Sequence, residues 1–87
     1  MPEDAITELD ARGLDCPMPL LKAKRALNAL RAGERLRVLA TDRGSVRDFE
    51  VFSRQSGCPL LSSEERDGVF IHVIEKAEPA QQAGRKG

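Results

Sequence analysis

The chain has 87 residues, which is enough for one small domain with a single hydrophobic core. Fourteen basic residues balance fourteen acidic ones, and this zero net charge argues against bulk electrostatic attraction to nucleic acid, though not against a local basic patch. No apolar run approaches the roughly 20 residues that span a bilayer, and the acidic start of the chain contains no hydrophobic signal core. We therefore expect a cytoplasmic protein that contacts neither a membrane nor, directly, a nucleic acid.

The first predicted elements are a strand and a helix. Residues 5–11 alternate loosely between apolar and polar side chains, as a strand does. A helix then begins at Pro17, because proline is favoured at the first helical position, and runs to about Arg31, before the C-cap residue Gly33. This assignment places Cys16 at the N-cap of the helix.

The predicted helix has one apolar stripe, which we expect to face the core. Its members are Pro19, Leu20, Ala23, Ala26, Leu27 and Leu30. On the other side of the helix lie Met18, Leu21, Lys22 and Arg25. Two exposed hydrophobic side chains beside two cations, all within two turns of Cys16, predict a surface for protein partners. Single surface hydrophobics and solvated basic faces are also common, so ordinary surface residues are the alternative.

A second strand and a second helix follow. Residues 35–41 alternate between apolar and polar side chains, which predicts a strand, and residues 42–45 form a turn. Ser45 is placed to cap the next helix, with Asp48 three residues later as the second member of a capping box. Gly57 ends this helix.

The last predicted elements are two strands joined by a tight turn. Residues 59–66 and 69–76 have the composition of strands, and the Asp-Gly pair between them is a strong hairpin signal. Residues 77–87 have little to bury, so we expect a disordered tail after one domain over residues 1–76. The order βαβαββ predicts a two-layer α/β sandwich, in which both helices cover one face of a four-stranded mixed sheet.

Cys16 is the first candidate for chemistry. A helix N-terminus carries about half a positive charge, which stabilises a thiolate, lowers the thiol pKa and favours nucleophilic attack. Pro17 fixes the backbone so that the sulfur projects from the helix end, whereas the carboxylate of Asp15 opposes the effect. The more distant Lys22 and Arg25 offset Asp15, so we expect a moderately activated, exposed thiol. The alternative is an inert, buried cysteine, since free cysteine is among the most buried residue types.

The other sulfur and imidazole groups give weaker signals. Cys58 leads into a strand, where we expect an inert thiol, and His72 lies within an apolar strand, where we expect a structural role. The chain has no CxxC pair and no Cys/His cluster, so we expect neither a metal site nor a bound cofactor. Two free thiols are expected, because a disulfide is unusual in a reducing cytoplasm.

The stretch LDARGLDCPMPLLKAKRAL, residues 9–27, closely resembles the signature of the TusA (SirA-like) family of small sulfur-carrier proteins. The family mark is a Cys-Pro-x-Pro motif that opens the first helix after a Gly-Leu pair. Here the motif spans residues 16–19 and the Gly-Leu pair is residues 13–14. The resemblance continues through TDRGSVRDF at residues 41–49 and covers the chain from about residue 9 to residue 76.

The resemblance implies both a βαβαββ sandwich and a function. Family members accept sulfur as a persulfide on the motif cysteine, which corresponds to Cys16. The motif residues around it are Gly13, Asp15, Pro17 and Pro19. A cysteine desulfurase or a rhodanese-like protein typically donates the sulfur, and another protein's cysteine accepts it. Known endpoints in the family are 2-thiouridine in tRNA, molybdenum cofactor supply and sulfur oxidation.

Two positions depart from the family pattern, and two other functions stay open. Arg43 stands where the family often has proline, and Cys58 where it frequently has a polar residue, which leaves the branch of the family undecided. A thiol-redox sensor is an alternative if Cys16 and Cys58 lie within disulfide range. A regulatory RNA-binding module is the other, although the chain lacks Tyr and Trp for base stacking. The principal expectation is a monomeric sulfur carrier.

Overall fold

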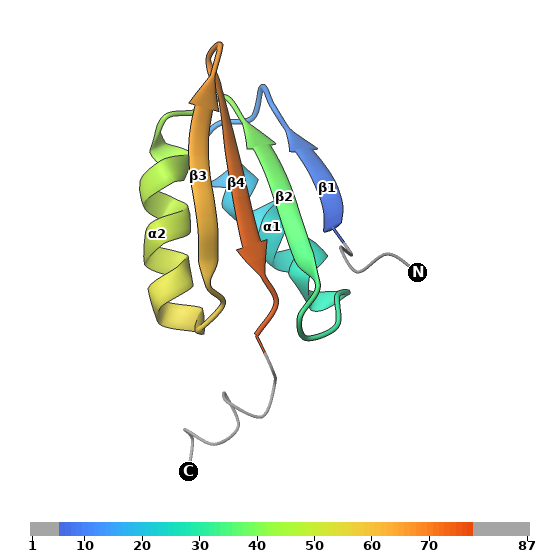
Figure 1. Cartoon of the computed structure of the whole chain (residues 1–87). Helices are drawn as coiled ribbons and strands as arrows, with labels where there is room; N and C mark the ends of the chain where they lie inside the picture. The colour runs from blue at the N-terminus through green and yellow to red at the C-terminus, as the bar shows by residue number, and fades with distance from the viewer. Residues whose placement is uncertain (1–5, 78–87) are drawn as a thin grey trace.

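Four strands form one mixed sheet, and both helices pack against the same face of it (Figure 1). The computed structural model describes residues 6–77. Its elements are β1 (Ile6–Ala11), α1 (Met18–Asn28), β2 (Arg35–Ala40), α2 (Gly44–Ser56), β3 (Leu60–Arg66) and β4 (Val69–Glu75). The predicted two-layer α/β sandwich with βαβαββ order is confirmed.

The strand order β1-β2-β4-β3 brings two loops together. β1 runs parallel to β2, with α1 as the crossover between them, and β4 pairs antiparallel with both β2 and β3. Adjacent parallel strands have their carboxyl ends at the same edge of the sheet. The loops that lead from β1 to α1 and from β2 to α2 therefore lie side by side. Between them, the Gly13 N–H donates a 2.9 Å hydrogen bond to Thr41 Oγ1.

The core lies between the sheet and the helices. Alternate residues of β2 point into it, so that Leu36 and Val38 are fully buried, and Phe49 of α2 is buried against the same face. The predicted stripe packs on the core, with Ala23 and Leu27 of α1 buried and its other members, including Leu30 just after the helix, at least partly buried. Full burial of one Leu or Phe side chain contributes about 1.5–3 kcal/mol to the free energy of unfolding. These contacts fix both helices on the sheet.

α1 is shorter than predicted at both ends. It begins at Met18 with Pro17 as the N-cap, so Cys16 lies one position before the N-cap and not at it. It ends at Asn28, because the Ala29 N–H bonds to the carbonyl three residues back and tightens the last turn. The polarised N–H groups of α1 are therefore one position farther along the chain from the cysteine than expected.

The predicted capping box at the start of α2 is wrong. Arg43 occupies the N-cap, and no side chain caps the helix. The Ser45 hydroxyl turns into the core instead, where its oxygen lies 2.9 Å from His72 Nε2. The Asp48 carboxylate turns toward the loop before α1. A buried imidazole needs polar partners. The helix start does not need the Ser45 hydroxyl, because the Ser45 and Val46 N–H groups donate to the carbonyl oxygens of Asp42 and Arg43.

Two turns match their predicted residues. Gly57 ends α2 in the left-handed conformation, with φ of 84°. Asp67 and Gly68 join β3 to β4 with φ of 49° and 83°. Positive φ at both central positions is what a two-residue hairpin turn requires, which explains the Asp-Gly pair.

The described chain continues one residue past the predicted domain boundary. Ala77, which the sequence prediction assigned to the tail, is 7% exposed and belongs to the core. Residues 78–87, the rest of the predicted tail, lie outside the described residues. Within the described part, none of the helices has the length and apolar character needed to cross a membrane.

Candidate functional site

Cys16 lies in the loop between β1 and α1, at the edge where the carboxyl ends of β1 and β2 meet. The residue is exposed. A 2.8 Å hydrogen bond from the Met18 N–H to the Asp15 carbonyl oxygen tightens the loop around it, and the Cys16–Pro17 peptide bond is cis. The predicted motif cysteine is therefore open to solvent at the start of a well-packed helix.

The loop between β2 and α2 holds Cys16 from the other side. The Cys16 backbone N–H donates a 2.8 Å hydrogen bond to Asp42 Oδ2. Gly44, the first residue of α2, lies against the cysteine, and a Cβ there would come within 3.4 Å of Cys16 Cβ and 3.3 Å of Asp42 Oδ2. The separation from Asp42 is tighter than ordinary van der Waals contact and that from Cys16 is at its lower limit, so glycine at this position lets the two loops approach.

The Cys16 thiol points toward α2. Its S–H donates a 2.6 Å hydrogen bond to Asp48 Oδ2. This hydrogen bond, together with partial desolvation and the negative charges of Asp48 and Asp42, raises the pKa of Cys16 to about 11. The hydrogen bond is the largest cause, because Asp48 stabilises the protonated thiol while its charge repels the thiolate.

The predicted moderately activated thiol is therefore wrong for the free protein. The sequence predicted that Cys16 is a helix N-cap and that Asp15 is the acid that raises its pKa. In the structure, the carboxylates that raise the pKa of the thiol are those of Asp48 and Asp42. A carboxylate in direct contact outweighs the partial charge of a helix end. The sequence did contain one indication of these acids. If the first two predicted strands pair in parallel, residues 42–48 lie beside the cysteine.

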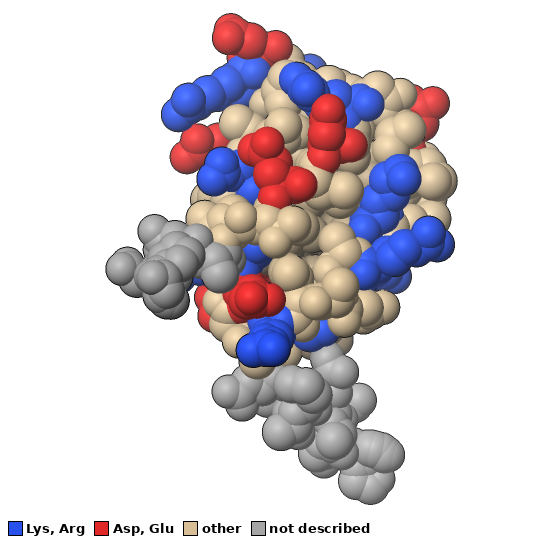
Figure 2. Space-filling view, turned by 90° about the vertical axis from the view of Figure 1, so that its right-hand side faces the viewer, with Lys and Arg blue, Asp and Glu red and all other residues tan. Residues whose placement is uncertain are grey.

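A mixed apolar and basic surface extends from Cys16 along α1. We call Met18, Leu21, Lys22 and Arg25 the α1 patch. All four residues are exposed, Met18 by 42% and Leu21 by 47%. Figure 2, which views the molecule from its β1 edge, shows Lys and Arg side chains gathered along the side where α1 lies. Lys22 and Arg25 also line a groove of about 220 Å³ beside β1.

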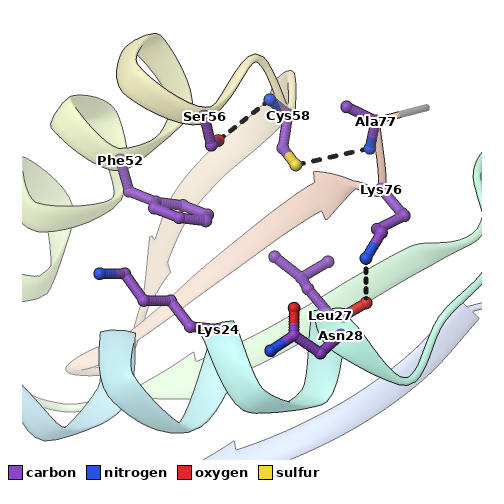
Figure 3. A pocket seen from close by; sticks show the side chains of 8 residues that line it. All are labelled: Lys24, Leu27, Asn28, Phe52, Ser56, Cys58, Lys76 and Ala77. Carbon is purple, nitrogen blue, oxygen red and sulfur yellow. Dashed lines mark hydrogen bonds between the residues drawn. The ribbon is translucent and has the colours of Figure 1, made fainter. Parts of the chain in front are cut away.

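Cys58 lies at the other end of the two helices. Cys58 is 5% exposed, and its sulfur accepts a 3.4 Å hydrogen bond from the Ala77 N–H. It lines a pocket of about 380 Å³ near the carboxyl ends of α1 and α2 (Figure 3). There the Lys24 ammonium lies 5.5 Å from the centroid of the Phe52 ring. Lys76 Nζ donates to a backbone carbonyl of α1. The burial of Cys58 fits the inert thiol that the sequence predicts.

The two cysteines are too far apart for a disulfide with each other. Cys16 precedes α1 and contacts α2 near its start, whereas Cys58 follows the end of α2. An α-helix rises about 1.5 Å per residue, so the 13 residues of α2 hold the two sites well beyond the roughly 7 Å between Cα atoms that a disulfide allows. The redox-sensor alternative lacks the geometry it requires.

His72 is enclosed between the sheet and α2. Its Nε2 lies 2.9 Å from Ser45 Oγ and its Nδ1 lies 2.8 Å from Ser63 Oγ. The ring stacks on Phe49 with the centroids 4.6 Å apart, and burial lowers the pKa of His72. Both ring nitrogens are occupied, which fits the expected structural role. Across residues 6–77, no three His, Cys, Asp or Glu side chains are arranged to hold a metal ion.

Comparison with known proteins identifies relatives across almost the whole described chain. The sequence profile of the family described as Sulfurtransferase TusA matches residues 7–76. The chain is 51% identical over 70 residues to the sulfur carrier protein TusA of Allochromatium vinosum, which covers 80% of this chain and 92% of the relative. It is 41% identical over 73 residues to the sulfur carrier protein TusA of Pseudomonas putida, which covers 84% of this chain and 89% of the relative.

A solved structure has the same architecture. The crystal structure of a SirA-like protein from Desulfitobacterium hafniense superimposes with a TM-score of 0.73 at 32% sequence identity. The superposition covers 84% of this chain and 99% of that chain. Sequence relatives and fold therefore point to one family.

Proposed function

The chain belongs to the TusA family of sulfurtransferases, and from this membership we propose that it is a sulfur carrier that holds sulfur as a persulfide on Cys16. The observation that carries the proposal is the position of Cys16, the exposed cysteine of the Cys-Pro-x-Pro motif, where the loops after β1 and β2 meet. Reaction sites in sheets with parallel strands commonly lie at this edge. The other cysteine of the chain, Cys58, is buried.

Uptake of sulfur in this proposal is a thiol exchange with a donor persulfide. The deprotonated Cys16 sulfur attacks the terminal sulfur of the donor, so that a new S–S bond forms on Cys16 and the S–S bond of the donor breaks. The donor leaves as a thiolate, and the transferred sulfur keeps its oxidation level. Delivery repeats the step, with an acceptor thiolate attacking the terminal sulfur and Cys16 as the leaving group.

The surroundings of Cys16 suit a carrier that must keep its sulfur until a partner arrives. A neighbouring thiol would attack the persulfide and release the sulfur as hydrogen sulfide. Cys58 is the only other cysteine in the chain, and it is buried at the far end of α2. The exposed loop leaves the persulfide accessible to more than one partner.

The donor in this proposal is a cysteine desulfurase or a rhodanese-like protein, and the acceptor is a cysteine of a downstream relay protein. Both dock on the α1 patch, whose apolar and basic side chains adjoin the Cys16 loop. Such a relay ends in thiolated tRNA, molybdenum cofactor or oxidised sulfur, and the carrier works in the cytoplasm as a monomer.

Incubation with a cysteine desulfurase and cysteine tests the proposal. Intact-mass spectrometry should show the gain of one sulfur atom, which is lost in Cys16→Ser and retained in Cys58→Ser. Treatment with dithiothreitol should remove the added sulfur, because a persulfide is reducible. No uptake from either desulfurase or rhodanese donors, or equal uptake by Cys16→Ser, would contradict the proposal.

A further inference from the structure

The thiol proton of Cys16 already has an acceptor in the resting protein. Cys16 Sγ lies 2.6 Å from Asp48 Oδ2, so the S–H is committed to this carboxylate. The backbone N–H of Cys16 is held separately by Asp42 Oδ2 at 2.8 Å. Two carboxylates therefore hold Cys16. Asp42 binds the backbone N–H of the cysteine, and Asp48 binds its thiol.

Asp48 is held in place without being neutralised. It belongs to α2 and precedes Phe49, whose fully buried side chain anchors this turn of the helix in the core. The salt bridges found among the described residues, with N···O distances up to 4.0 Å, include neither Asp48 nor Asp42. Among the described residues, no Lys or Arg therefore forms a salt bridge with the Asp48 carboxylate, whose Oδ2 accepts the hydrogen bond from the thiol.

We propose, on the premise of the carrier function above, that Asp48 is a catalytic residue of sulfur transfer, whose carboxylate accepts the Cys16 proton during uptake and protonates the Cys16 sulfur during delivery. In uptake, the Cys16 Sγ forms a bond to the terminal donor sulfur as its proton moves to Asp48 Oδ2. The donor S–S bond breaks, its electron pair stays on the donor sulfur, and the proton passes from Asp48 to that sulfur. The products are the Cys16 persulfide, a donor thiol and the Asp48 carboxylate.

Delivery reverses the direction of the proton. The acceptor thiol gives its proton to Asp48 as its sulfur attacks the terminal sulfur of the Cys16 persulfide. The S–S bond on Cys16 breaks, its electron pair stays on Cys16 Sγ, and Asp48 returns the proton to that sulfur. The acceptor gains the persulfide, Cys16 regains its thiol, and no electron donor or acceptor is consumed.

The same contact keeps the free carrier unreactive. The thiolate is the form that attacks alkylating agents and oxidants, and a thiol with a pKa of about 11 carries very little thiolate near neutral pH. A persulfide docked in line with Cys16 Sγ is attacked as the proton moves to a base that is already in position. Asp48 thus makes Cys16 selective for partners that are bound, at the expense of reaction with small molecules in solution.

Several charged side chains surround the thiol, and only one of them contacts it. Asp42 and Asp48 face Cys16 from the second loop and from α2, and Asp15 is its neighbour in the chain. Arg43 and Arg47 stand next to the two facing acids in sequence. Of these groups only Asp48 is hydrogen-bonded to the sulfur, so a single substitution isolates its contribution.

Asp48→Asn should change two rates in opposite directions. Alkylation of the free protein by iodoacetamide at about pH 8 should be about tenfold faster than for the wild-type, because the thiolate fraction rises more than its nucleophilicity falls. The pH profile of alkylation should shift to lower pH. Sulfur uptake from a desulfurase persulfide should instead slow by about a hundredfold, as for loss of a general base. If Asp48 had a purely structural role, the alkylation rate and the uptake rate would not change in opposite directions.

Three further variants complete the experiment. Glu50→Gln removes the same charge from an exposed position of α2, and both rates should stay at the wild-type level. Asp48→Glu keeps a carboxylate and should recover part of the uptake, which also covers the case in which Asp48→Asn does not fold. Cys16→Ser measures the background alkylation of Cys58.

The outcomes separate the catalytic role from the carrier function. Sulfur uptake by Asp48→Asn at the wild-type rate overturns the role of Asp48 and leaves the carrier function intact. Unchanged alkylation in Asp48→Asn overturns the contact on which the role rests. If the wild-type takes up no sulfur, the carrier function fails and the catalytic role fails with it.

Discussion

The two cysteines of this chain flank the helices at opposite ends of the molecule and have contrasting surroundings. Cys16 precedes α1, is exposed and is held by two carboxylates. Cys58 follows α2, is 5% exposed and accepts a backbone N–H in a partly apolar pocket. Burial shields Cys58 permanently, whereas Cys16 is restrained by one hydrogen bond to a side chain. Exposure alone therefore does not make a thiol reactive, since the group that holds its proton matters as much.

The contrast follows from the position of each cysteine relative to the sheet. Cys16 lies where β1 and β2 end in parallel, so the polar loops that follow both strands converge on it. Cys58 lies where α2 turns back into β3, and there the chain after β4 closes the core against it through Ala77. The first end is open and charged, whereas at the second end the cysteine itself is packed into the core.

Large-to-small substitutions near the two ends should give the largest effects. Phe49→Ala removes a fully buried ring next to Asp48 in α2, and Leu27→Ala removes a side chain beside the Cys58 pocket. Each should lower the free energy of unfolding by about 2–5 kcal/mol in a urea titration. Only Phe49→Ala should also change the alkylation rate of Cys16, because it loosens the turn that carries Asp48. An equal change of that rate in Leu27→Ala would show that the two ends are not independent.

The fold was predictable to the extent that it depends on neighbours in sequence. The alternating strands, the inner stripe of α1 and the Asp-Gly hairpin each follow from local periodicity or local backbone conformation, and the structure confirms them. The motif cysteine was also predictable as an exposed residue before a helix. The ends of the elements were less predictable. The last turn of α1 depends on a hydrogen bond between residues three apart, which the apolar periodicity does not indicate.

The electrostatics of the site were not predictable from local rules. The hydrogen bonds that govern Cys16 join it to residues 26 and 32 positions away, which reach it only through the parallel pairing of β1 and β2. Asp15, the nearest acid in sequence, is not among the causes of the raised thiol pKa. Ser45 was assigned to a cap for the same reason, since its true partner His72 is 27 positions away.

Charge reversals at the two ends test whether partners dock only at the Cys16 end. Arg25→Glu combined with Leu21→Asp in the α1 patch should lower sulfur uptake from a donor by about ten- to hundredfold, mainly through KM. Arg54→Glu makes the same charge reversal as Arg25→Glu, but in the last turn of α2, toward the Cys58 end, and should leave uptake unchanged. Initial rates measured against carrier concentration distinguish these results. Unchanged transfer from every donor in the double variant would remove the α1 patch as the docking surface.

The smallest expected effect is a pH dependence that originates at His72, in the middle of β4. His72 contacts Ser45 near the start of α2, and burial lowers the pKa of His72 from its ordinary value of 6.5. Below about pH 6.5 the unfolded chain therefore binds more protons than the folded one, so the free energy of unfolding decreases as the pH falls and is unaffected by this group at higher pH. Asp10, whose pKa the hydrogen-bonded Arg12 lowers to about 2, contributes to acid sensitivity only below its ordinary value of 3.8.

Acidification should accordingly loosen one end of the molecule before the other. Urea titrations between about pH 7.5 and pH 5 should show decreasing stability for the wild-type and for Cys58→Ser, and a flat profile for His72→Gln, which cannot be protonated. Amide hydrogen exchange should then lose protection first at the start of α2, because the Ser45 partner of the imidazole lies there. If protection is lost first around Cys58, acid destabilises the Cys58 end first. Protonation of His72 then does not destabilise the turn of α2 that carries Asp48.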